Sequence, residues 1–401
     1  MILPRLRSDL NLMPSPVAER PGLLIRDDFG YSDAILIIPP FLVRCLLFYD
    51  GVRTDIDLQA ELSRIAGGEA DTADAVQGLT TQLSQAGFLE DEVYAELRNR
   101  CHAAFAQSPV RKAAHAGKSY PAAIDPLREV MRGYLGAGTT AAHNGAIAIA
   151  SPHASPEHAW QSYQAAYQCL TPDLHDRTFV VLGTSHYGEP DKFGLTRKPF
   201  ETPYGTTTID DRLVAELASQ PAVLMEDYCH AVEHSIEFQV LFLQSIYGPN
   251  VRILPILCGS FGRSIYQGRL PEENDHVNRF LGTLGEIAAR EATRLFWVLG
   301  IDMAHIGARY GDKFSIQAGS EQMARVEQRD RLRIDRVNAS DSRGFWDLVR
   351  ENQDDLKWCG SSPLYTFLKA VPGTQGTLHS YQHWNIDDQS VVTFASMSFQ
   401  A

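Results

Sequence analysis

The sequence predicts an α/β protein with a mixed central sheet and flanking helices, preceded by a small separate domain. Two observations predict the sheet. Three short apolar runs, 146–150, 179–182 and 296–301, have the composition of buried strands. Segments with helical periodicity alternate with these runs along the chain, which is the pattern of α/β folds.

The overall composition is that of a globular protein with room for two or three domains in 401 residues. Hydrophobic residues make up 44% and charged residues 21%. The net charge of −13 argues against a general nucleic-acid-binding surface. The most apolar run, 34–49, is interrupted by Pro39 and Pro40 and carries Arg44, so we expect no membrane span and no membrane partner.

No secretory signal is evident at the N-terminus, because the first residues lack a long apolar stretch. The six cysteines show no C-x-x-C spacing; they are Cys45, Cys101, Cys169, Cys229, Cys258 and Cys359. Several of these cysteines lie in apolar stretches of the sequence, where small buried thiols are expected. We therefore expect a reducing, cytoplasmic location without disulfides.

The first domain is expected over residues 1–110. Four prolines mark 1–22 as an irregular lead-in, and the runs 23–26 and 35–38 form a predicted hairpin. Pro39 and Pro40 open a helix that ends near Tyr49. Three further helices are predicted over 55–66, 71–85 and 91–105.

This order of elements is similar to a winged-helix unit, and over residues 20–92 it resembles the PqqD-like domains. That resemblance implies binding of a leader peptide, which adds a strand to the sheet edge. The alternative is an accessory domain that docks on the rest of the chain. DNA binding is disfavoured because the third helix begins with Asp71 and Asp74, which oppose phosphate contact.

The second domain, 111–401, begins with an amphipathic helix over 126–135. Helices then alternate with strands; the predicted helices are 160–170, 210–218, 234–247 and 280–290, and the strands 146–150, 179–182, 251–257 and 296–301. Asp210 is a predicted N-cap. A charged helix over 322–336 is expected to be solvated; a helix reaching Ala370 and a strand over 391–397 complete the domain.

Each of the three central strands leads directly to a histidine. His153 follows the first strand, His186 the second, and Asp302 and His305 the third. Ligands of open α/β sheets gather at the carboxyl ends of strands. If the strands are parallel neighbours, these side chains meet in one crevice, whereas a single such histidine would more often be structural.

A fourth stretch, 229–237, carries two histidines and two glutamates. His230, His234 and Glu237 fall at i, i+4 and i+7, which would place them on one helical face, with Glu233 beside them. The spacing is close to that of a zincin, but Ala231 stands where the glutamate should follow the first histidine.

The order of these motifs resembles the Memo family, which includes the B component of the AmmeMemoRadiSam system. The motifs are Ala116-Gly117 with Tyr120-Pro121, Pro152-His153-Ala154, Gly183-Thr184-Ser185-His186, Thr202-Pro203-Tyr204-Gly205, Glu233-His234-Ser235-Ile236-Glu237, Asp302-x-x-His305 and Cys359-Gly360. The resemblance covers about 111–401. It implies a fold like that of the LigB-type extradiol dioxygenases and a metal-binding crevice with an oxidative role.

The same resemblance implies that His153 and His186 are metal ligands and that His234 is a third histidine of the crevice. Asp302 and His305 match the acidic and histidine positions after the last core strand.

A cysteine ligand of the animal members would correspond to Ala304, which cannot coordinate a metal. The third protein ligand therefore stays open between His234, His305, Asp302 and water. Two or three imidazoles with a carboxylate suit Fe(II), our first expectation, and equally Cu or Zn.

Further roles are expected around such a metal. His234 or His305 would act as a base near neutral pH, and Glu233 or Glu237 would orient an imidazole. Cys359 either approaches the crevice or is buried without chemistry.

The sequence thus predicts a non-haem iron-dependent oxidoreductase, similar to a dioxygenase, acting on a small molecule or a modified peptide. A leader peptide or a radical-SAM protein would be its partner. Two alternatives remain. One is a non-catalytic peptide-binding protein with a vestigial metal crevice, which Ala304 favours. The other is a zinc-dependent hydrolase, in which metal-bound water attacks an ester or amide.

Overall fold

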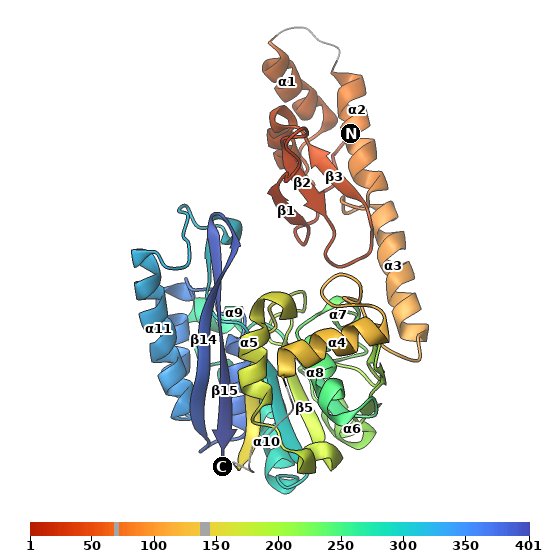
Figure 1. Cartoon of the computed structure of the whole chain (residues 1–401). Coiled ribbons are helices and arrows are strands. Elements are labelled where there is room, and N and C mark those ends of the chain that lie inside the picture. The colour runs from red at the N-terminus through yellow and green to blue at the C-terminus, as the bar shows by residue number, and fades with distance from the viewer. Residues whose placement is uncertain (68–71, 137–144) are drawn as a thin grey trace. The chain divides into compact units, whose positions relative to one another are not determined.

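A computed structural model describes residues 1–67, 72–136 and 145–401 (Figure 1). The chain divides into two compact units, Met1–Gln107 and Ser108–Ala401. Among the described residues, no helix combines the length and apolar character needed to cross a membrane.

The smaller unit contains a three-stranded antiparallel sheet of β1 (Asn11–Pro14), β2 (Leu23–Arg26) and β3 (Ile35–Ile38), in that order. The predicted hairpin of β2 and β3 is confirmed. The prediction of an irregular lead-in is wrong, because residues 11–14 pair with β2. Pro14 fits there because it ends a strand at the sheet edge, where a missing N–H costs little.

Helical segments complete the smaller unit: η1 (Pro40–Phe48), α1 (Asp55–Ala66), α2 (Ala73–Gln85) and α3 (Glu92–Gln107). The segment after Pro39 is a 3₁₀ helix rather than the expected α-helix. Asp71, the predicted start of the helix over 71–85, lies outside the described residues. A capping box between Thr54 and Asp57 begins α1, and Leu58 and Leu83 are fully buried in the core.

The larger unit is built on a mixed sheet in the order β10-β6-β11-β5-β12-β4-β15-β13. The strands are β4 (Ala146–Ser151), β5 (Thr178–Thr184), β6 (Phe193–Leu195), β9 (Thr208–Ile209), β10 (Val223–Met225), β11 (Arg252–Cys258), β12 (Leu295–Gly300), β13 (His305–Gly307), β14 (Gln375–Asp387) and β15 (Ser390–Gln400). The central strands β11, β5, β12 and β4 are parallel, whereas β6 runs antiparallel to β11 and β15 runs antiparallel to β4. The predicted mixed α/β sheet is confirmed.

The sequence did not predict the strands β6, β10, β13 and β14 of this sheet region. The long strand β14 pairs with β15, and a two-stranded ribbon joins β7 (Glu201–Thr202) to β8 (Gly205–Thr206). In β14 most side chains are half-buried or exposed, so its sequence lacks the apolar run by which the central strands were recognised.

Helices cover both faces of the central sheet (Figure 1). On one face α8 (Glu237–Tyr247) packs near α5 (Pro156–Tyr167), with α4 (Ile124–Leu135) against both. The opposite face holds α10 (Asp275–Arg290) and α13 (Ser361–Ala370). Alternate strand residues serve the two faces: the Phe179 ring contacts Tyr247 of α8, and the Trp297 ring contacts Phe367 of α13.

The remaining helices are α6 (Asp211–Ala218), α7 (Cys229–Val232), α9 (Gly262–Gln267), α11 (Glu321–Asn338) and α12 (Ser342–Arg350), with short 3₁₀ turns at Pro172–Asp176, Pro271–Glu273, Ala308–Tyr310 and Glu351–Gln353. Asp210 caps α6 as predicted, since its side chain accepts from the N–H of Leu213.

The expectation of a solvated helix over 322–336 is wrong. One face of α11 is buried; its buried residues are Met323, Val326, Asp330, Arg333, Ile334 and Val337. The many charges on its other face obscure this stripe in the sequence. The two buried charges, Asp330 and Arg333, each have hydrogen-bond partners in the fold.

The segment between α12 and α13 has an unusual backbone. Asn352, Gln353, Asp354 and Lys357 adopt φ values of 53, 56, 53 and 53°. Non-glycine residues in this left-handed region cost about 1 kcal/mol or more each. Two ion pairs hold the segment: Arg333 with Asp354 at 2.9 Å and Asp312 with Lys357 at 2.8 Å.

Candidate metal centre

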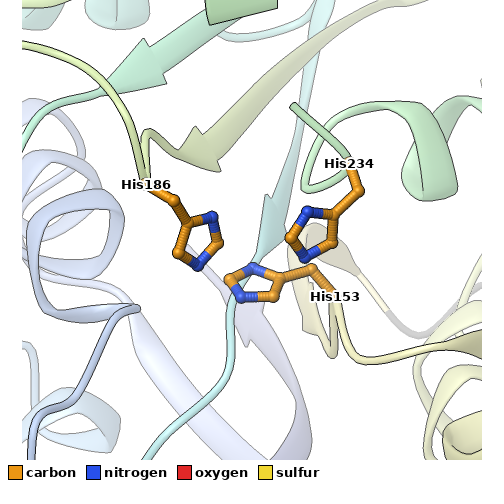
Figure 2. A group of neighbouring side chains, drawn as sticks. All are labelled: His153, His186 and His234. Atoms are coloured by element: carbon orange, nitrogen blue, oxygen red, sulfur yellow. The ribbon is translucent and has the colours of Figure 1, made fainter. Parts of the chain in front are cut away.

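Three histidines converge at the carboxyl end of the central sheet (Figure 2). His153 follows β4, His186 follows β5, and His234 lies in the turn between α7 and α8. One ring nitrogen of each lies within 4.8 Å of the others. The His153 side chain is 2% exposed, whereas those of His186 and His234 are 28% and 27% exposed. The group is therefore open to solvent on the side of His186 and His234.

Two strand glycines allow the α7–α8 turn to reach the sheet. A Cβ atom on Gly183 would lie 2.5 Å from Oγ of Ser235, and one on Gly300 would lie 2.3 Å from the Ser235 carbonyl oxygen. Any side chain at these positions would push the turn, and with it the neighbouring His234, away from the other two histidines. The glycines that end the apolar runs in the sequence thus have a steric reason.

Glu233 orients two of the rings. Its carboxylate accepts from the backbone N–H of His186 at 2.9 Å and of His234 at 2.8 Å. Oε1 also lies 3.1 Å from Nδ1 of His186 and 3.1 Å from Nδ1 of His234. With Nδ1 engaged in this way, the Nε2 atoms of both rings are available on the other side.

Glu233 and His186 form an ion pair in which the carboxylate is buried and the imidazole is partly exposed. Burial raises the pKa of Glu233, but the charge of His186 outweighs it and holds the pKa well below its ordinary value. Burial lowers the pKa of His186, but the Glu233 carboxylate holds that pKa well above its ordinary value. In the absence of a metal, the pair is charged at neutral pH.

His153 is fixed from the opposite side. Its Nδ1 lies 2.9 Å from the Gly300 carbonyl, to which it donates. Oδ1 of Asp302 accepts from the backbone N–H of His153 at 3.0 Å and of Ala154 at 3.2 Å. Burial, with repulsion from His186, holds the pKa of His153 well below its ordinary value. The ring is therefore neutral, with its Nε2 lone pair directed away from Gly300.

Cys359 approaches this group, as one of the two interpretations of the sequence expects. Its Sγ lies 3.2 Å from Nε2 of His153 and 3.6 Å from the Asp302 carbonyl. Burial raises the pKa of the thiol. Gly360 permits the approach, because a Cβ there would lie 2.6 Å from Cβ of Ile301. The Cys-Gly pair before a helix was the sequence signal for this contact.

Asp302 and His305 line the same edge. Oδ2 of Asp302 lies 3.6 Å from Nε2 of His153, and burial raises the Asp302 pKa. His305 donates from Nδ1 to the carbonyls of Met303 at 2.9 Å and Lys357 at 3.2 Å. Burial, opposed by Asp302, lowers the pKa of His305 to about 4. The imidazole is thus neutral, with Nε2 unprotonated.

Glu237 and His230 are engaged elsewhere. The Glu237 carboxylate pairs with Arg111 and accepts from Tyr120 and from two backbone N–H groups, of Ala114 and His115. Nε2 of His230 lies 3.0 Å from the Gly194 carbonyl. The predicted single helical face is wrong, because the chain leaves the helix after Val232 and re-enters one at Glu237.

Two residues that the sequence did not single out support the third histidine. The Arg111 guanidinium is fully buried and donates to the carbonyls of His230 at 2.6 Å and Glu233 at 2.7 Å. The His115 ring meets that of His234 edge-on, with centroids 5.7 Å apart. Arg111 thereby holds both ends of the turn that carries Glu233.

Comparison with known proteins covers most of the chain. A sequence model of the family described as Memo-like protein matches residues 111–398. A MEMO1 family protein of Aquifex aeolicus is 23% identical over 94% of this chain and 95% of its own length. MEMO1 family proteins of Methanopyrus kandleri and Thermococcus kodakarensis are 26% and 27% identical, over 72% and 73% of this chain and 99% of theirs.

Proposed function

Because this chain belongs to the Memo-like protein family, we propose that His153, His186 and His234 hold a divalent transition-metal ion that serves in an oxidation. The single observation that carries the proposal is the convergence of three imidazole nitrogens within 4.8 Å. Imidazole is the commonest protein ligand of such metals.

The hydrogen bonds of the three rings fit a metal site. Each Nδ1 has an acceptor, Glu233 for His186 and His234 and the Gly300 carbonyl for His153. Metal-ligating histidines almost always have this second partner, which fixes the tautomer and the ring orientation. The Cys359 thiol at 3.2 Å from Nε2 of His153 offers a further donor. We therefore propose this thiol, rather than residue 304, as the additional protein ligand.

Fe(II) is our first choice of metal, and the donor set also suits Cu or Zn. Bound iron would supply electron transfer to or from O₂ and substrate. The chain's own groups would then orient the ligands and the substrate. Asp302 fixes the backbone of His153, and neutral His305 presents an unprotonated Nε2 that would accept a hydrogen bond from a substrate hydroxyl or thiol. A small molecule or a modified peptide is the proposed substrate.

The proposal is tested by the metal content of protein purified without oxygen, beside the variant H153A/H186A. His158→Ala is the matched control, since this exposed ring stacks on Trp384 at 4.4 Å and lies outside the group. We expect near-stoichiometric iron in wild type and control, and its loss in the double variant. Stoichiometric zinc together with esterase or amidase activity would show that the metal serves hydrolysis and not the proposed oxidation. Wild type that binds no transition metal would contradict the proposal.

A second candidate function, peptide binding, is favoured by a groove in the smaller unit. The groove has a volume of about 630 Å³ and a mainly apolar lining; its residues are Phe41, Leu42, Leu62, Ile65, Ala66, Thr72, Ala75, Gly78, Leu79 and Gln82. Phe41 is 59% exposed there, and β3 lies at the edge of its sheet. Both features suit a peptide with apolar side chains.

This candidate is tested by measuring the affinity of a fluorescent leader-type peptide for the full chain and for Phe41→Asp. Leu47→Asp is the matched control, since Leu47 is 68% exposed and does not line the groove. Selective loss of binding in Phe41→Asp is expected. Equal binding by both variants would exclude the groove.

A further inference from the structure

A fully buried carboxylate lies behind the histidine group. Asp330 of α11 is 0% exposed and accepts three hydrogen bonds from uncharged donors. These are Nε1 of Trp358 at 2.6 Å, the Tyr381 hydroxyl at 2.7 Å and Oγ1 of Thr393 at 2.6 Å. Burying a carboxylate is costly, so bonds of this number and length are required to keep it there.

Two of these donors are connected to residues of the site. Trp358 directly precedes Cys359. Thr393 accepts, through the same Oγ1, from the backbone N–H of Ala304 at 2.8 Å, between Asp302 and His305. The backbone of Thr393 also accepts from the N–H of Met303 at 2.8 Å. One carboxylate thus supports two neighbouring parts of the site, the chain that leads into Cys359 and the segment between Asp302 and His305.

Arg333, one turn further along α11, strengthens this support. Its guanidinium lies 5.3 Å from the ring centroid of Trp358 and pairs with Asp354 at 2.9 Å. The indole of Trp358 is therefore held at its N–H by a carboxylate and at its face by a cation. Asp354 belongs to the left-handed segment that precedes Cys359, so α11 fixes this segment at two points.

The chemistry of the three donors requires an acceptor-only group at position 330. An asparagine would retain the shape, but its NH₂ would face the hydroxyls of Tyr381 and Thr393. Thr393 already accepts the Ala304 N–H, so its own proton would then need another acceptor. We propose that Asp330 is a positioning residue that holds the Cys359 thiol and the Asp302–His305 segment against the three histidines.

The inference that Asp330 supports a metal centre rests on the proposed function. The effect of Asp330 on the placement of Cys359 can be tested without metal. The variants are Asp330→Asn and the matched control Asp335→Asn, which alters an exposed carboxylate of the same helix. Metal-free protein is treated with iodoacetamide under native conditions, and the modification rates of Cys359 and Cys258 are followed by peptide mass spectrometry. Cys258 is 1% exposed on β11 and reports opening of the whole sheet.

In Asp330→Asn we expect Cys359 to react about tenfold faster, with Cys258 unchanged, since one or two buried hydrogen bonds to a charge are lost locally. Asp335→Asn should match wild type at both cysteines. An unchanged Cys359 rate would overturn the proposal. Equal acceleration of Cys359 and Cys258 would also overturn it, because the role would then be general stability.

A second measurement compares the Co²⁺ affinity of the same proteins. A loss of about 10–100-fold in Asp330→Asn is expected for a residue that orients ligands. If wild type binds no metal, the proposed function fails while the alkylation result still decides the role of Asp330. Should Asp330→Asn not fold, Trp358→Phe is used in its place. It removes the indole N–H donor and keeps an aromatic ring at this position, and an unchanged Cys359 rate there would overturn the proposal equally.

Discussion

We expect Glu233→Gln to disturb the histidine group more than other single substitutions. The change is nearly isosteric, and it removes the charge that faces His186 and His234. Oε1 lies 2.8 Å from the His234 backbone nitrogen and 3.1 Å from both Nδ1 atoms, and Oε2 lies 2.9 Å from the His186 backbone nitrogen. An amide NH₂ at either position would face an N–H donor.

The expected loss of stability follows from these contacts. Removing one partner of a buried ion pair costs about 3–5 kcal/mol. The His186 side chain is 28% exposed and can release its proton to water, so we expect about 2–3 kcal/mol in the metal-free protein near pH 6. Metal affinity should fall about 10–100-fold, because two ligand rings lose their orientation. Urea unfolding followed by circular dichroism and metal competition titration measure the two effects.

The pKa shifts of His186 and Glu233 predict how the stability difference between wild type and Glu233→Gln changes with pH. The folded pKa of His186 is raised above its ordinary value of 6.5, so its contribution is complete below pH 6.5 and fades as the pH rises further. The folded pKa of Glu233 is lowered below its ordinary value of 4.5, so its contribution is complete above pH 4.5 and fades as the pH falls. The stability difference between wild type and Glu233→Gln should therefore be largest between pH 4.5 and 6.5. A difference that is absent, or constant from pH 4 to 9, would refute this reasoning.

Three further predictions follow from other contacts. Gly300→Ala should displace the α7–α8 turn and lower both the melting temperature and metal content, whereas Gly282→Ala, with open space around its Cβ, should be neutral or stabilising in thermal denaturation. His305→Gln should reduce the loss of stability on acidification, because the lowered His305 pKa of about 4 makes wild type lose stability as the pH falls from 6.5 through 4. Urea titrations measure the stability of both proteins at each pH. Parallel curves of stability against pH would contradict this prediction. Arg111→Met should destabilise the protein by about 3–5 kcal/mol, because it leaves Glu237 buried without its cation, and the double variant with Glu237→Gln should recover part of this in chemical denaturation.

The sequence was sufficient where local pattern and tertiary position coincide. The strands before His153 and His186 are buried on both faces, so their apolar runs and terminal histidines are visible without a structure. The meeting of the two rings follows from parallel strands with aligned ends. The Memo-like region was identified separately, by the resemblance of its ordered motifs to that family, and its mixed sheet is confirmed.

Elsewhere the local pattern was misleading. The spacing of His230, His234 and Glu237 is helical, but the chain changes direction between them, and periodicity contains no information on such a break. His230 consequently donates to a sheet carbonyl far along the chain. The place of Cys359 depends on contacts with α11, and the burial of Asp330 among many charged neighbours could not be read from a single sequence.

The left-handed segment before Cys359 limits how this arrangement can be transplanted. Asparagine and aspartate tolerate such a backbone, but Gln353 and Lys357 do so only while the surrounding ion pairs persist. In an excised peptide or a smaller designed scaffold, these residues would relax to right-handed or extended conformations, and the thiol would swing away from the imidazoles. A miniature copy of the centre would need glycine at both positions, or the whole of α11 carried with it.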